Sequence, residues 1–330
     1  MEKIAFIIGE DFLYWSPLIL ALGVLAAVAM FLGLQMLHTG KLTAAFLTVP
    51  LALLLGAALG RLVYWYCLPD SYGSLKAALT DFSADGYALL GVFAGCALAA
   101  GFMGLIRVTR GLPAMLDCMA VAGCLGMAVG RLNHFFNPFD RGMVLNTLRT
   151  LPLAYPIANE ATGEAEYRLA TFMVQALVAA ALFVILLVHF LTTGRKRGGE
   201  TCLLFCLCHG ASQIVMDSTR YDSLFLRSNG FVSMVQIAGA VLMVLAVVLF
   251  SVRMVRVRGF KWWFVLFWVA IVGLLTAAGI MEYYVQRISI RADFFYHIMT
   301  ACLAAAVLIT VVICILGIPS RMQWAKTQEV

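Results

Sequence analysis

Charged residues are scarce in this sequence. They make up 12% of the 330 residues, whereas a soluble domain carries roughly a quarter. Hydrophobic residues account for 63% of the chain, and the mean hydropathy is +0.96. This balance excludes a water-exposed globular domain, a disordered chain, a coiled coil and a nucleic-acid-binding protein.

The cysteines also lack a recognisable pattern. There are nine, an odd number, and most fall inside apolar stretches, so they do not form a secreted disulfide framework. Cys202, Cys206 and Cys208 lie close together, but neither spacing is C-x-x-C and the run is hydrophobic, so we interpret them as small packing residues of a helix. No phosphate loop, dinucleotide fingerprint or hydrolase motif is present. The sequence therefore predicts no metal site and no cofactor.

Long apolar runs dominate the chain instead. A membrane-spanning helix needs about 20 apolar residues. The sequence predicts an all-α, polytopic integral membrane protein with about nine transmembrane helices. The predicted spans are residues 17–37, 43–68, 87–106, 113–136, 169–192, 201–217, 231–252, 262–284 and 294–318.

The loop charges predict the orientation. One set of alternate loops carries 12 basic and 2 acidic residues, and the other carries 9 basic and 14 acidic residues. Basic residues concentrate on the cytoplasmic side of membrane proteins. The N-terminus is therefore predicted outside and the C-terminus in the cytoplasm.

A few charged residues lie near the ends of predicted spans, where charge is costly and indicates function. Arg61, Arg131 and the pair Asp217-x-x-Arg220 stand at the outer ends of the second, fourth and sixth spans. The simple alternative is that each arginine reaches the lipid phosphates on its own. Because guanidinium groups bind phosphate by a bidentate fork, their shared depth favours a site for a phospholipid headgroup or a similar anion.

These segments resemble a known family. Over about residues 15–255 the chain is similar to prolipoprotein diacylglyceryl transferases, in the order of its motifs. The motifs that carry the resemblance are Gly60-Arg61-Leu62-x-Tyr64, Asp85-Gly86 before the third span, Gly130-Arg131-Leu132-x-x-Phe135-x-Asn137, and Asp217-x-x-Arg220.

The resemblance implies a multi-pass enzyme of the bacterial plasma (inner) membrane. Family members move the diacylglyceryl group of phosphatidylglycerol onto the lipobox cysteine of a prolipoprotein. The implied partners are phosphatidylglycerol, the prolipoprotein signal-peptide lipobox and membrane lipids, with no nucleic acid. The implied catalytic residues are Arg131, His134, Asp217 and Arg220, and the implied headgroup-binding residues are Arg61, Tyr64, Gly130, Asn137 and Gly142.

The chain also departs from the family pattern. Leu90 and Gln213 stand where the family has a histidine and an arginine, and His134 replaces an asparagine. Phe139 replaces a glutamate, although Asp140 is adjacent. Two predicted spans lie beyond the usual seven. We therefore divide the chain into two parts. Residues 1–255 form a transferase-like membrane domain of about seven spans, and residues 256–330 form two additional spans.

Three functions follow as hypotheses. The first is diacylglyceryl transfer, with attack by the substrate thiolate on the glyceryl carbon. Arg131, together with Arg61 or Arg220, would stabilise the leaving glycerol phosphate, and Asp217 would orient Arg220. His134 is a substitute for the missing histidine if its ring faces the same cavity. The second is a non-catalytic, lipid- or lipoprotein-binding descendant, favoured by the two substitutions. The third is a small-molecule transporter, suggested by the two similar Gly-Arg-Leu segments, although the polar groups lie at one end of the spans and not at the midplane.

Overall fold

The computed structural model is mostly helical and describes the chain in segments separated by short gaps. Asp85, part of one motif above, lies outside the described residues. The described residues are 4–8, 11–81, 86–108, 111–137, 139–145, 153–158, 163, 165–227, 229–287 and 292–319.

The chain forms two compact units. The first comprises Met1–Phe205 and Thr219–Ile237, and the second comprises Cys206–Ser218 and Ala238–Val330. The sequence predicted a different kind of division, between a transferase-like domain at residues 1–255 and two additional spans at residues 256–330. That division marks where the family resemblance ends, and it stays a prediction.

Each of the nine predicted spans corresponds to a helix, and the predicted all-α membrane class is confirmed. The helices are α1 (Trp15–Thr39), α2 (Thr43–Cys67), α4 (Leu89–Leu105), α5 (Leu112–Gly130), α6 (Thr171–Thr192), α7 (Glu200–Ser218), α8 (Met234–Arg258), α9 (Phe264–Arg287) and α10 (Ala292–Leu316).

Seven of these helices in the described part of the chain are long and apolar enough to cross a membrane: α1, α2, α5 with its extension to Phe135, α6, α8, α9 and α10. A helix of 25 residues, such as α1, rises about 37 Å, which exceeds the hydrocarbon core of about 30 Å. Helix α4 is apolar but has only 17 residues, and α7 is less apolar. The count of nine spans and the orientation of the chain stay predictions.

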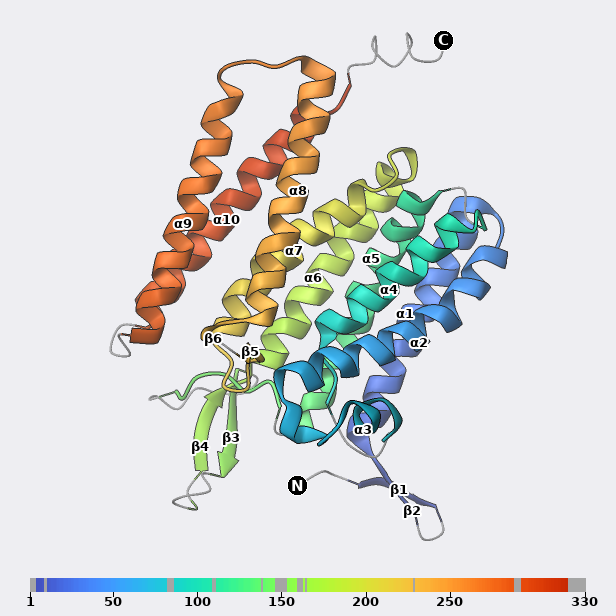
Figure 1. The fold of residues 1–330 in the computed structure, drawn as a ribbon, viewed down its shortest axis with the longest axis vertical. Helices are drawn as coiled ribbons and strands as arrows, with labels where there is room; N and C mark the ends of the chain where they lie inside the picture. Colours follow the sequence, from blue (N-terminus) through green and yellow to red (C-terminus); the bar gives the residue numbers. More distant parts are fainter. Residues whose placement is uncertain are drawn as a thin grey trace. The chain divides into compact units, whose positions relative to one another are not determined.

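Within the first unit, α2 packs most closely on α4, while α1 and α6 pack on α5 (Figure 1). Glycines allow these approaches. A Cβ at Gly95 of α4 would collide with the backbone of Leu55 in α2, and a Cβ at Gly23 of α1 would lie 2.8 Å from the backbone nitrogen of Gly130. Small residues serve this purpose in membranes, where lipid removes most of the hydrophobic drive for helix association.

A buried carboxylate joins α5 to the start of α7. Asp117, fully buried in α5, accepts hydrogen bonds from the backbone N–H groups of Gly199 (2.6 Å) and Cys202 (2.7 Å). The first N–H groups of a helix have no partner within the helix, and they carry a partial positive charge. Asp117 therefore acts as the N-terminal cap of α7 from a neighbouring helix.

Three short hairpins lie at the end of the first unit where α1 begins and α5 ends (Figure 1). The sequence analysis did not predict them. Each hairpin is antiparallel and has two strands. They pair β1 (Ile4–Ile8) with β2 (Asp11–Tyr14), β3 (Ala154–Ala158) with β4 (Ala165–Leu169), and β5 (Phe225–Leu226) with β6 (Asn229–Ser233). The short helices α3 (Leu75–Thr80), η1 (Pro69–Ser71), η2 (Arg131–Phe135) and η3 (Gly194–Lys196) complete the unit.

In the second unit, α9 and α10 pack along one another (Figure 1). A hydrogen bond of 3.0 Å from Trp268 Nε1 to Ser251 Oγ joins α9 to α8. Near the start of α8, a Cβ on Gly210 of α7 would lie 2.5 Å from the carbonyl oxygen of Gly239, so the two backbones are in direct contact. Tyr296 of α10 donates a 2.9 Å hydrogen bond to the carbonyl oxygen of Ser218.

Candidate functional site

The end of α5 places Arg131 beside a polar loop. Gly130 is the last residue of the α-helix, and the chain continues as the tighter helix η2, which begins at Arg131. Residues such as Asn133 and Asn137 favour this change because their side chains compete for backbone hydrogen bonds. The loop that follows turns at Asp140, whose φ of 56° lies in the left-handed region.

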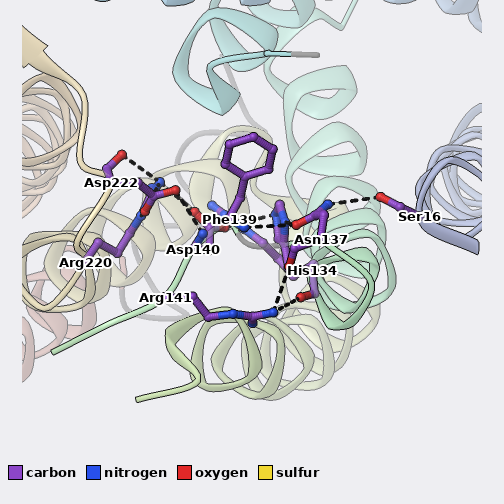
Figure 2. A network of polar contacts seen from close by, with 9 residues as sticks. Ser16, His134, Asn137, Phe139, Asp140, Arg141, Arg220 and Asp222 are labelled. Atoms are coloured by element: carbon purple, nitrogen blue, oxygen red, sulfur yellow. Dashed lines mark hydrogen bonds and ion pairs between the residues drawn. The ribbon is translucent and has the colours of Figure 1, made fainter. Parts of the chain in front are cut away.

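Three basic side chains converge on the carboxylate of Asp140. Arg131 Nη1 and His134 Nε2 both approach Oδ2, the histidine at 3.1 Å. Arg220 Nη2 lies 2.6 Å from Oδ1. Asp140 is only 3% exposed, so this is a buried cluster (Figure 2). We call Arg131, His134, Asp140 and Arg220 the Asp140 cluster.

Asp222 supports the cluster from the segment that follows α7. Its Oδ1 lies 3.2 Å from Arg220, and its Oδ2 accepts a 2.9 Å hydrogen bond from the backbone N–H of Asp140. Arg220 is therefore oriented by two carboxylates, those of Asp140 and Asp222 (Figure 2). Asp222 did not stand out in the sequence, because its place in the cluster depends on a contact with a distant loop.

His134 lies between two oxygen atoms. Its Nδ1 is 2.7 Å from Asn137 Oδ1, and its Nε2 faces Asp140. The amide orientation of Asn137 follows from its other bonds, because Oδ1 also accepts the backbone N–H of Phe139 (3.2 Å) and Nδ2 donates to Ser16 Oγ (3.0 Å). Nδ1 of His134 is therefore the donor in its contact with Asn137.

Arg141 holds the backbone of this loop. Its Nη2 donates to the carbonyl oxygens of His134 (2.5 Å) and Asn137 (2.7 Å). Its guanidinium lies over the rings of Tyr155 and Phe172, with distances of 4.0 and 4.5 Å from Cζ to the ring centres. Burial lowers the pKa of Arg141 to about 10, so the group keeps its charge at neutral pH. Arg141 was not among the site residues predicted from the sequence.

Close packing requires a glycine at position 142 but not at position 130, where a Cβ would meet only Leu20 Cδ1 at 3.8 Å. The backbone of Gly142 pairs with Arg220 across an isolated bridge, and a Cβ there would collide with Thr171 Oγ1. Gly142 thus brings the loop against the segment that carries Arg220. Gly130 is buried and lies against Gly23 of α1.

Arg61 and Tyr64 belong to a second cluster, formed by α2 and the segment after it. Arg61 is 2% exposed and donates hydrogen bonds to the carbonyl oxygens of Ala78 (3.2 Å) and Asp81. Its guanidinium also lies over the rings of Tyr72 and Tyr87, at 5.2 and 4.9 Å. The described contacts of Arg61 therefore anchor the connection between α2 and α4.

Tyr64 packs beside the same connection. Its ring meets that of Tyr72 edge-on, with centres 6.1 Å apart, and a Cβ at Gly86 would collide with it. Tyr72 in turn donates a 2.8 Å hydrogen bond to the carbonyl oxygen of Gly86.

The structure thus brings together Arg131, His134, Asn137 and Arg220 of the predicted site residues, with Gly142 beside them. Asp217 is buried in the last turns of α7, in the second unit. Its predicted role in orienting Arg220 stays a prediction.

Comparison with known proteins agrees with the motif order. The family model described as prolipoprotein diacylglyceryl transferase matches residues 3–252. A phosphatidylglycerol–prolipoprotein diacylglyceryl transferase of Parasynechococcus marenigrum (strain WH8102) is 26% identical over 257 residues, which cover 73% of this chain and 90% of the relative.

Two further relatives carry the same name. The protein from Streptococcus equi subsp. zooepidemicus (strain H70) is 24% identical over 274 residues, 80% of this chain and 99% of the relative. The protein from Gloeobacter violaceus is 31% identical over 161 residues, 48% of this chain and 58% of the relative. Helices α9 and α10 lie beyond the residues that the family model matches.

Proposed function

The chain belongs to the prolipoprotein diacylglyceryl transferase family, and we propose that it transfers the diacylglyceryl group of phosphatidylglycerol to the lipobox cysteine of a prolipoprotein. The convergence of Arg131 and Arg220 on one buried anionic position is the observation that supports this proposal most directly. We place the reaction in the bacterial plasma membrane, where both substrates reside.

The proposed reaction is a displacement at carbon. The sulfur of the substrate cysteine attacks the glyceryl carbon, the bond between that carbon and the phosphate oxygen breaks, and glycerol phosphate leaves with the electron pair. Arg131 and Arg220 stabilise the charge that develops on the phosphate, because fixed cationic donors act most strongly in a buried site. We assign headgroup contacts to Asn137 and to the loop at Gly142, which adjoin these arginines.

The thiol needs little activation. A cysteine is a few per cent ionised near neutral pH and is intrinsically nucleophilic. The absence of the family histidine, where this chain has Leu90, therefore removes a general base worth about 10²–10⁴-fold in rate but not the nucleophile. His134 is the group of the cluster that we propose to take the thiol proton.

A non-catalytic, lipid-binding descendant is the second candidate. It is favoured by one observation: Leu90 and Gln213 stand where the family pattern has a histidine and an arginine. The two candidates differ in turnover and not in headgroup affinity.

Complementation separates them. We expect the wild-type chain to restore lipoprotein lipidation in transferase-depleted bacteria, and Arg131→Ala to abolish it. The matched control is Arg195→Ala, because Arg195 is exposed and bonds the carbonyl oxygen of Leu37 at the far end of α1. Membrane levels of each variant are measured by immunoblot.

The same variants are assayed with purified protein, phosphatidylglycerol and a lipobox peptide. Transfer by Arg131→Ala at the wild-type level would remove the catalytic assignment. Lack of rescue and lack of transfer by the wild type itself would leave the non-catalytic descendant.

A further inference from the structure

Asp140 is an unusual occupant of a phosphate-binding site. Three basic groups face its carboxylate, and two of them are the guanidinium groups that the proposed mechanism needs. A carboxylate and a phosphate accept the same forked hydrogen bonds from arginine, so both fit this position. They cannot occupy it together, because their charges repel.

We propose that Asp140 is an internal counter-ion that a phosphate group displaces from Arg131 and Arg220 when it binds. This inference rests on the proposed function only in taking these arginines as the phosphate ligands. The ligand class is a phosphate ester with unesterified oxygens, as in a phospholipid headgroup or free glycerol phosphate.

The backbone at Asp140 allows such an exchange. The residue lies in a loop turn and not in a helix, with φ at 56°. Its N–H donates to Asp222 Oδ2, and its carbonyl oxygen accepts a 3.2 Å hydrogen bond from the N–H of Phe172. These bonds hold the peptide groups and do not involve the carboxylate, so a rotation about χ1 and χ2 would break neither of them.

Charge makes the exchange selective for anions. Arg131 and Arg220 are mostly buried, with 14% and 11% of their side chains exposed. A buried charge that loses its partner is strongly destabilising, because the interior does not solvate it as water does. Water or a neutral alcohol therefore does not displace Asp140 from the arginines, whereas a group that carries its own negative charge does.

The same movement changes His134. Asn137 Oδ1 accepts the hydrogen bond from Nδ1–H, so the contact between Nε2 and Asp140 needs a second proton, shared by the ring and the carboxyl group. When Asp140 leaves with that proton, the neutral ring presents the lone pair of Nε2 to a substrate thiol. The thiol proton then passes to Nε2 as the carbon–sulfur bond forms and the carbon–oxygen bond breaks. Phosphate binding thus prepares both the arginines and the proton acceptor.

The test is binding of glycerol phosphate to the full-length chain in detergent micelles, measured by calorimetry at neutral pH. Asp140→Asn keeps the size of the side chain and removes the competing charge. We expect it to bind glycerol phosphate at least about tenfold more tightly than the wild type, since one fewer negative charge competes for the arginines. Glycerol without phosphate should bind neither protein.

The matched control is Glu166→Gln. Glu166 is also paired with an arginine, Arg168, at 2.6 Å on strand β4, but it lies outside the Asp140 cluster. Glu166→Gln should leave the affinity for glycerol phosphate unchanged. Equal or weaker glycerol phosphate binding by Asp140→Asn would overturn the proposal.

A second measurement uses the wild type and does not depend on the folding of a variant. The ¹⁵N signal of His134 Nε2, assigned by its loss in His134→Gln, should shift on addition of glycerol phosphate, and an unchanged signal would also overturn the proposal. Transfer is assayed separately. If the wild type catalyses transfer but neither the tighter binding by Asp140→Asn nor the shift of the His134 signal is seen, only the counter-ion proposal is refuted. If both effects are seen without transfer, only the proposed enzymatic function is refuted.

The source of the phosphate is distinguished by a parallel titration. Micelles containing phosphatidylglycerol should compete with glycerol phosphate, whereas micelles of a neutral diacylglycerol should not. Competition by phosphatidylglycerol identifies the membrane lipid as an occupant of the site. Competition by the neutral diacylglycerol would overturn the selectivity for anions.

Discussion

The guanidinium of Arg220 lies 2.6 Å from the carboxylate of Asp140, and this ion pair joins the loop after α5 to the segment after α7. The two segments also pair through their backbones, at Gly142 and Arg220. The residues of the Asp140 cluster are thus carried by segments that constrain one another. A change that moves one loop therefore disturbs the groups on the other.

The first prediction concerns Arg141, which holds the backbone of the loop after α5. Arg141→Ala removes two hydrogen bonds to loop carbonyl groups and a cation–π stack, a loss on the order of 3 kcal/mol. We expect a lower midpoint of thermal unfolding in detergent and a higher KM for phosphatidylglycerol. Arg227→Ala is the control, because Arg227 also lies near aromatic rings but is exposed and outside the loop. Equal stability of Arg141→Ala and the wild type would contradict the positioning role.

Asp117 gives a prediction about stability alone. Asp117→Ala leaves the N–H groups of Gly199 and Cys202 without their acceptor, at about 1–3 kcal/mol for each buried donor. We expect a lower unfolding midpoint and less protein in the membrane, with an unchanged rate of transfer per folded molecule. Asp70→Ala, at the short helix η1, serves as the control. A loss of transfer in well-folded Asp117→Ala would show that this carboxylate does more than cap α7.

The packing of α2 against α4 is tested by a pair of glycines in the same helix. Gly95→Val forces a side chain into the backbone of Leu55, whereas a Cβ at Gly101 would meet nothing within 4 Å. Overpacking of this kind costs about 1–3 kcal/mol. We expect Gly95→Val to lower the unfolding midpoint and Gly101→Val to leave it near the wild-type value. Similar behaviour of the two variants would argue against direct backbone contact between α2 and α4.

Hydropathy alone was enough to locate the helices, because a bilayer demands about 20 apolar residues wherever the chain crosses it. Several helix boundaries differ from the predicted ones. For example, α8 begins at Met234 and not at 231, because residues 229–233 form a strand, and α5 ends at Gly130 and not at 136, because η2 begins at Arg131. The hairpins were missed because their strands are short, and their pairing is not encoded in a long hydrophobic pattern.

Only part of the candidate site was predicted from the sequence, because contacts between distant loops leave no hydrophobic pattern. Arg131, His134 and Arg220 stood out as polar residues at the ends of apolar runs, and the structure brings them together. Asp140 and Asp222 were missed as their partners, because they lie in loops where any acidic residue is unremarkable by sequence. Their contacts depend on a turn with positive φ and on pairing between distant segments.

The cap that α5 provides for α7 has a consequence for biogenesis. α7 is one of the less hydrophobic helices of the chain, and its first turn relies on a carboxylate that belongs to α5. A chain is synthesised from its N-terminus, so Asp117 of α5 is made before the backbone N–H groups of Gly199 and Cys202 that it caps. The acceptor therefore already exists when the first turn of α7 forms.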